Sequence, residues 1–137
     1  MSRPTADDLT SVPLFAGLSE EVRAALAARL EYHSVHEGLR IVTEGVGGYE
    51  LYVVREGTLT VEQHGRHVGT LGPGDVFGEI SILGQGRRTA TVTADCPGLL
   101  LGMYGTSLRE LDEEAPDAAA LIRSAMEAHL AADEQRE

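Results

Sequence analysis

The chain has 137 residues, enough for one domain whose hydrophobic core needs neither disulfides nor a metal. Its 22 acidic and 11 basic residues give a formal net charge of −11, and such a surface repels nucleic acid and anionic membranes. We therefore expect no direct contact with nucleic acid or a membrane. The single cysteine, Cys96, excludes an intramolecular disulfide and favours a cytoplasmic location.

Residues from about 5 to 31 are expected to be mainly helical. Ser19 followed by two glutamates is typical of the N-cap and first turn of an α-helix. Apolar residues before it predict a short helix and a turn around Pro13: Leu9, Val12, Leu14 and Phe15. Apolar residues after it recur at helical spacing: Val22, Leu26 and Leu30.

Residues from about 32 to 104 are expected to form short strands separated by glycine-rich turns. Residues 58–62 (TLTVE) alternate polar and apolar side chains, which is the period of a half-buried strand. Residues 64–67 (HGRH) predict a hairpin tip, and Asp75 after Gly74 predicts a turn in which the carboxylate binds its own backbone. The other predicted strands are residues 50–54, 68–71, 89–94 and 99–101. This pattern indicates an antiparallel β-roll, a jelly-roll-like barrel.

From about residue 106 to 131 the pattern becomes helical again. Ser107 and Glu110 have the spacing of a capping box, and Pro116 divides the segment into two helices. The second helix has one apolar stripe: Leu121, Ile122, Ala125, Met126 and Leu130. The chain as a whole, residues 1–137, is thus predicted to be a single domain, mainly β with flanking helices.

Residues 71–94 (LGPGDVFGEISILGQGRRTATVTA) carry the pattern that is most informative about function. A glycine, Gly78, precedes a short helical turn, so that backbone N–H groups can approach an anion. Arg88 precedes the next strand, and a guanidinium can bind two phosphate oxygens. Glu79, a carboxylate within this anion site, is suited to accept a hydrogen bond from a sugar hydroxyl.

This segment resembles the phosphate-binding cassette of the cyclic nucleotide-binding family, which includes bacterial cAMP-responsive regulators, protein kinase A regulatory subunits and cyclic-nucleotide-gated channels. Residues 77–82 (FGEISI) and 88–92 (RTATV) match the two halves of the family pattern. Residues 12–19 (VPLFAGLS) are similar to its opening helix and turn, and residues 44–57 to its first hairpin. The resemblance extends over about residues 10 to 130. Within that hairpin, Val46 and Tyr49 replace the family's usual aspartates, at a turn.

The resemblance implies that the chain is a sensory or regulatory module that binds a cyclic purine mononucleotide, cAMP or cGMP. Arg88 would pair with the cyclic phosphate, Glu79 would bind the ribose 2′-hydroxyl, and backbone amides of the cassette would face the phosphate. Thr89 would lie near the phosphate and base, where a hydroxyl favours accepting cGMP without excluding cAMP. The ligand residues implied are Phe77, Gly78, Glu79, Ile80, Ser81, Arg88, Thr89 and Ala90.

In relatives, the helix that corresponds to residues 118–132 either caps the base or pairs with its twin in a dimer. These residues supply about two heptads, whereas a coiled coil needs about three or four, so we expect capping. The candidate cap residues are Arg123, Met126 and Leu130. No effector sequence is recognisable, so we expect either an effector protein as partner or an effector domain in a larger protein.

Three alternatives compete with this interpretation. One alternative is a metal-binding cupin, which is also a jelly roll, because histidines occur in pairs at residues 33 and 36 and at residues 64 and 67. An H-x-x-H pair across a hairpin tip points outward, however, so we expect no metal or cofactor. No nucleophile with a base partner is readable, so the chain is not expected to be an enzyme. A protein-interaction module that no longer binds nucleotide is the other class, and the intact Glu79 and Arg88 argue against it.

Overall fold

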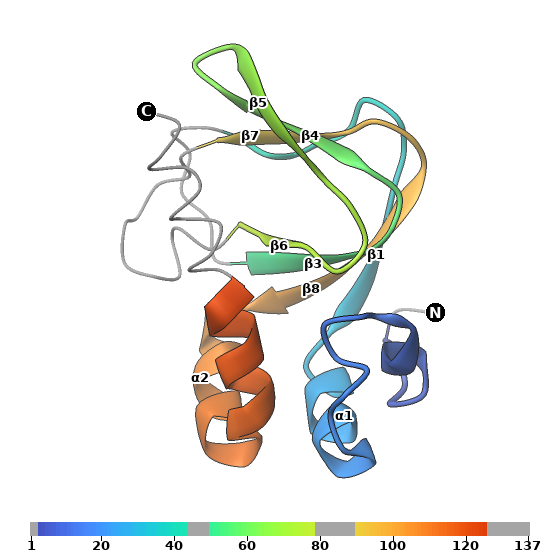
Figure 1. The fold of residues 1–137 in the computed structure, drawn as a ribbon, viewed down its shortest axis with the longest axis vertical. Helices are drawn as coiled ribbons and strands as arrows, with labels where there is room; N and C mark the ends of the chain where they lie inside the picture. The colour runs from blue at the N-terminus through green and yellow to red at the C-terminus, as the bar shows by residue number, and fades with distance from the viewer. Residues whose placement is uncertain (1–2, 44–49, 79–89, 126–137) are drawn as a thin grey trace.

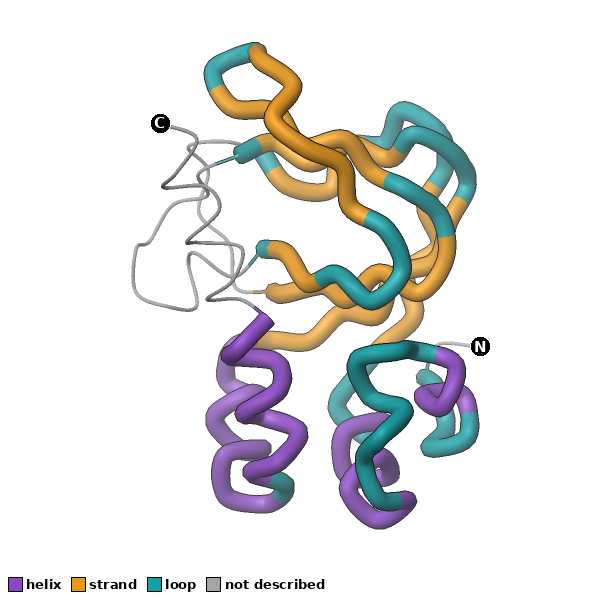
Figure 2. The backbone as a smooth tube through the Cα atoms, viewed as in Figure 1, coloured by secondary structure: helices purple, strands orange, loops and turns teal. Residues whose placement is uncertain are grey.

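The computed structural model describes residues 3–43, 50–78 and 90–125. Two β-sheets form the upper part of the molecule, and helices lie beneath the lower sheet (Figures 1 and 2). The helices are the 3-10 helix η1 (Asp8–Ser11), α1 (Glu20–Ala27), α2 (Gly105–Glu114) and a further helical segment over residues 116–125. The strands are β1 (Glu31–Val35), β2 (Arg40–Val42), β3 (Glu50–Glu56), β4 (Leu59–Gln63), β5 (Arg66–Leu71), β6 (Val76–Phe77), β7 (Thr91–Ala94) and β8 (Gly98–Tyr104).

The strands form two four-stranded sheets, with the orders β1-β8-β3-β6 and β2-β7-β4-β5. Every pairing is antiparallel, which confirms the predicted antiparallel roll. The two sheets enclose an apolar interior, because buried side chains from both sheets form one cluster there: Val35, Val42, Val54, Leu59, Val61, Leu71, Phe77, Val92, Ala94 and Leu100.

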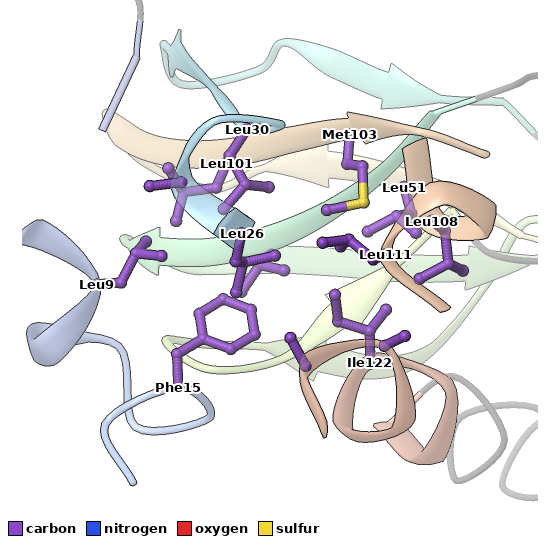
Figure 3. Close-up of a cluster of buried hydrophobic side chains, with 14 of the residues drawn as sticks. Leu9, Phe15, Leu26, Leu30, Leu51, Leu101, Met103, Leu108, Leu111 and Ile122 are labelled. Carbon is purple, nitrogen blue, oxygen red and sulfur yellow. The ribbon is translucent and has the colours of Figure 1, made fainter. Parts of the chain in front are cut away.

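The other face of the β1-β8-β3-β6 sheet packs on the helices. Along β3, Leu51 and Val53 belong to the helical side, whereas Tyr52 and Val54 belong to the interior, as the period of a strand requires. Phe15 from the N-terminal segment and Ile122 from the C-terminal helix reach the same core from opposite ends (Figure 3). The sheet therefore has apolar cover on both faces.

The predicted turns are confirmed by the backbone. The β4–β5 hairpin turns at His64 and Gly65, whose φ angles are 53° and 77°. Two successive residues with positive φ characterise the tight turn that matches the twist of a hairpin. In the second turn, the Gly72 N–H donates to Oδ2 of Asp75 at 2.8 Å, which is the bond to local backbone that the sequence predicted.

The helix boundaries confirm one predicted cap and contradict another. The hydroxyl of Ser19 accepts a hydrogen bond from the Val22 N–H at 3.2 Å, as an N-cap does. The predicted capping box at Ser107 is wrong, because α2 begins at Gly105 directly after β8 and its N-cap is Tyr104. Strand β8 continues through Tyr104 because β3 pairs with it as far as that residue, so the chain enters α2 two residues before Ser107. The break before Pro116 is confirmed, since α2 ends at Glu114 and Ala115 is not helical.

Gly98 provides a stability test, because it lies in close contact with the β3–β4 turn. A Cβ at this position would lie 2.6 Å from the carbonyl oxygen of Glu56. Since that neighbour is backbone, it cannot move without disturbing the sheet, and we expect Gly98→Ala to lower the free energy of unfolding by about 1–3 kcal/mol. Urea unfolding followed by circular dichroism measures this loss. Gly17→Ala is the matched control: a Cβ added at Gly17 would lie more than 4 Å from every described residue other than its two chain neighbours. An equal loss there would contradict the explanation.

Candidate functional site

The structure describes the two ends of the predicted cassette, residues 77–78 and 90. Phe77 and Gly78 end the described range 50–78, and Ala90 begins the described range 90–125. The predicted ligand residues between them lie outside the described residues: Glu79, Ile80, Ser81, Arg88 and Thr89. Two of the predicted cap residues, Met126 and Leu130, also lie outside them.

Phe77 and Gly78 leave the lower sheet at its edge strand. Phe77 is 4% exposed and belongs to the interior cluster, and its register partner on β3 is Tyr52. Gly78 is buried and has a φ of 88°, in the left-handed region that side chains with a Cβ rarely adopt. The glycine of the cassette pattern is therefore required by the backbone at the point where the chain leaves β6.

Ala90 enters the upper sheet. It is half-buried against the interior cluster and directly precedes β7, which pairs with β2 and β4. The two described ends of the cassette thus come from opposite sheets and lie at the same end of the roll (Figure 1). A ligand held there would face the apolar interior between the sheets.

Sequence reasoning did not identify the residues that form the wall of this interior. Val61 on β4 is buried, and Val68 on β5 packs against the same cluster while remaining half-buried. The alternation of buried and half-buried residues along β4 was the available signal, but it does not show which ligand the wall would meet. Both residues are aliphatic, so this part of the interior is apolar.

The histidines that raised a metal site have other surroundings. Nε2 of His33 lies 3.5 Å from Oε2 of Glu50, and Nδ1 of His36 lies 3.1 Å from the carbonyl oxygen of Glu37. Over residues 3–43, 50–78 and 90–125, no three His, Cys, Asp or Glu side chains form a group that could hold a metal ion. His33 instead belongs to a polar group with Glu50 and Tyr52 on the inner face of the lower sheet.

Arg123 is the described member of the predicted cap. Its guanidinium binds both carboxylate oxygens of Asp112 in α2, with Nε–Oδ1 3.2 Å and Nη2–Oδ2 2.7 Å. The hydrogen bond from Arg123 holds the pKa of Asp112 below its usual value. In this arrangement Arg123 connects the two C-terminal helices. To cap a ligand, its guanidinium would have to leave Asp112 and contact the ligand instead. Ile122 and Ala125 of the same helix pack on the core beneath the sheet.

Helices in the described part of the chain are all too short or too polar to cross a membrane.

Comparison with known proteins gives one consistent result. The family model described as cyclic nucleotide-binding domain matches residues 32–114. The human potassium/sodium hyperpolarization-activated cyclic nucleotide-gated channel 2 is 33% identical over 108 residues, which cover 79% of this chain and 12% of the channel. The chain therefore spans about one eighth of the length of that relative.

Solved structures agree with the family match. The catabolite activator protein of Thermus thermophilus has a TM-score of 0.76 at 30% identity, covering 90% of this chain and 61% of that one. The regulatory domain of Toxoplasma gondii PKA, crystallised with cAMP, has a TM-score of 0.72 at 23% identity, covering 90% of this chain and 48% of that one. From the roll, the placement of the cassette ends and these matches, we conclude that the chain belongs to the cyclic nucleotide-binding domain family.

Proposed function

We propose that this chain binds cAMP or cGMP between its two sheets and acts as a regulatory module. The observation that carries the proposal is the placement of the cassette ends. Phe77 and the left-handed Gly78 come from one sheet, Ala90 comes from the other, and both ends face an apolar interior. The names of the similar proteins, a gated channel, an activator and a kinase regulatory domain, support a regulatory role over a catalytic one.

The roles of the cassette residues form part of the proposal. Arg88 pairs with the cyclic phosphate, together with backbone amides of Gly78, Ile80 and Ser81, and Glu79 accepts a hydrogen bond from the ribose 2′-hydroxyl. Apart from Gly78, these residues lie outside the described part of the chain. A chain with net charge −11 needs such local donors, because its overall field opposes an anion.

Calorimetric titration of the chain with cAMP and with cGMP tests the proposal. We expect saturable binding of at least one of them at one site per chain, and much weaker binding of 5′-AMP, whose phosphate is not closed onto the ribose. If neither cyclic nucleotide binds, the alternative is supported, namely a protein-interaction module on the same fold.

Thr89 is proposed to contribute to the choice between the two nucleotides. If its hydroxyl bonds the 2-amino group of guanine, Thr89→Ala removes a hydrogen bond from cGMP alone. One such bond contributes about 0.5–1.5 kcal/mol, so we expect affinity for cGMP to fall about twofold to tenfold more than affinity for cAMP. Parallel titrations of the variant measure the two losses, and Thr93→Ala, at a position within β7, is the control. Equal losses for both nucleotides would show that Thr89 contacts only the phosphate.

The output of binding is proposed to pass through another protein or another domain. The match to this chain covers 12% of the channel and 61% of the activator. In both proteins, therefore, the matching domain is one part of a longer chain. We propose that the C-terminal helix caps the base, with Arg123, Met126 and Leu130 as candidate contacts, and that ligand shifts its equilibrium position. The single cysteine, Cys96, suits a cytoplasmic setting.

A further inference from the structure

Two side chains of β3 and one of β1 form a chain of contacts on the inner face of the lower sheet. Nε2 of His33 lies 3.5 Å from Oε2 of Glu50, and the Tyr52 hydroxyl donates to Oε1 of the same carboxylate at 3.2 Å. The rings of His33 and Tyr52 also meet edge to face, with 5.8 Å between centroids. Glu50 therefore connects the imidazole on β1 to the tyrosine on β3.

The other end of this chain of contacts is the first residue of the cassette. Tyr52 and Phe77 are register partners on neighbouring strands, and their rings stack with 5.2 Å between centroids and 26° between planes. Such a cross-strand aromatic pair restricts the orientation of both rings. The position of Tyr52 thus determines how Phe77 is held directly before Gly78.

Gly102 makes the contact between His33 and Glu50 possible. Strand β8 lies between β1 and β3, so the two side chains meet over it. A Cβ on Gly102 would lie 2.7 Å from Nε2 of His33 and 3.2 Å from Oε2 of Glu50. The imidazole and the carboxylate therefore occupy the space that a side chain on β8 would fill.

A proton on Nε2 of His33 would strengthen its contact with Glu50. Nε2 of His33 is buried and has no hydrogen-bond partner of good geometry in the described part of the chain, although the carboxylate is near. A lone pair on Nε2 would be repelled by the carboxylate, whereas an N–H on a charged imidazole would be attracted. Histidine is the side chain that ordinarily changes charge between pH 5 and 8.

Charged groups from neighbouring elements also lie near this contact. Glu50 and Gly102 line a cavity of about 210 Å³ together with Glu31, Tyr104, Arg3 and Arg29. Arg29 is engaged by Glu110 at 2.8 Å and by Glu114 at 2.5 Å, and Nη1 of Arg3 donates to the Ala28 carbonyl at 2.6 Å.

We infer that His33, Glu50 and Tyr52 form a proton-dependent brace that positions Phe77, so that nucleotide affinity depends on the charge of His33. This inference rests on the proposed function. The three are positioning residues, since they act on the ligand through Phe77. When His33 is protonated, the ion pair holds Glu50 in place to accept from Tyr52, and more of the protein is ready to bind. Affinity is therefore highest at low pH and falls as pH rises and the imidazole loses its charge.

Calorimetry with cAMP and cGMP between pH 5.5 and 8 tests the brace. For the unmodified chain we expect affinity to fall about threefold to tenfold across this range, the effect of about one hydrogen bond. In His33→Gln the affinity should not change with pH. Tyr52→Phe keeps the ring stack but loses the hydroxyl, and should bind more weakly at pH 5.5 with a flatter pH profile. The control is His36→Gln, an exposed histidine in the next turn, which should retain the full pH dependence.

Two results would overturn the brace: an affinity that does not change with pH in the unmodified chain, or a pH dependence that survives in His33→Gln. If the unmodified chain binds neither nucleotide at any pH, the proposed function fails, and nuclear magnetic resonance of the ligand-free chain decides about the brace. We expect the imidazole signals of His33 and the amide signal of Gly78 to titrate together, and Glu50→Gln to remove the response at Gly78. The inference would be contradicted if the Gly78 amide signal did not change over the pH range in which the His33 signals change.

Discussion

Arg88→Ala is expected to weaken cyclic nucleotide binding by about tenfold to a hundredfold or more, whichever nucleotide the chain prefers. In the proposed site Arg88 is the cation that meets the cyclic phosphate, and a charge-assisted hydrogen bond contributes about 1.5–3 kcal/mol. Without the guanidinium, the phosphate keeps only backbone donors. The overall charge of −11 makes the loss more severe, because no excess of positive charge elsewhere draws the anion in. Calorimetric titration of the variant measures the change.

Arg87→Ala is the matched control for this prediction. It removes the same charge one position earlier, at a residue that the cassette pattern does not include. We expect its affinity to stay within about twofold of the unmodified chain, as for a solvated surface charge. Equal losses of affinity in the two variants would mean that binding depends on positive charge in this region and not on Arg88 in particular. An unchanged affinity in Arg88→Ala would show that Arg88 does not bind the phosphate.

Phe15→Ala is expected to lower the free energy of unfolding by about 3–5 kcal/mol, the largest stability loss that we predict. Phe15 is fully buried, in the core that joins the N-terminal segment to the lower sheet and α1 (Figure 3). Removing the ring leaves a cavity between elements that are far apart in sequence and cannot collapse onto one another easily. Urea denaturation followed by circular dichroism measures the loss.

Tyr104→Ala is the control for Phe15→Ala, since it removes an aromatic ring that is 57% exposed. A substitution at such a surface position is expected to change stability by no more than about 0.5 kcal/mol. A loss at Tyr104 as large as the loss at Phe15 would contradict the view that burial decides the effect.

Local patterns in the sequence predicted the features that depend on neighbours along the chain. The alternation in residues 58–62, the hairpin tip at His64 and Gly65, the Asp75 turn and the Ser19 cap all appear in the structure. Each depends on bonds or spacings within a few residues, so the amino-acid sequence specifies it directly. The cassette pattern likewise predicted the family, which the comparisons confirm.

Features that depend on contacts between distant segments were not predicted. The start of α2 at Gly105 follows from how far β8 pairs with β3, and a capping pattern at Ser107 carries no information about that pairing. The placement of Phe77 and Ala90 on opposite sheets follows from the strand order.

By itself, then, the sequence determined the β-roll class through periodic patterns, the local turns and caps through neighbouring residues, and the family through the resemblance of its cassette motif. Only the tertiary structure decided that His33, one of several histidines in the sequence, lies beside Glu50 over Gly102 and is connected through Tyr52 to Phe77. These residues come from four strands whose register brings them together, and no local spacing encodes that register.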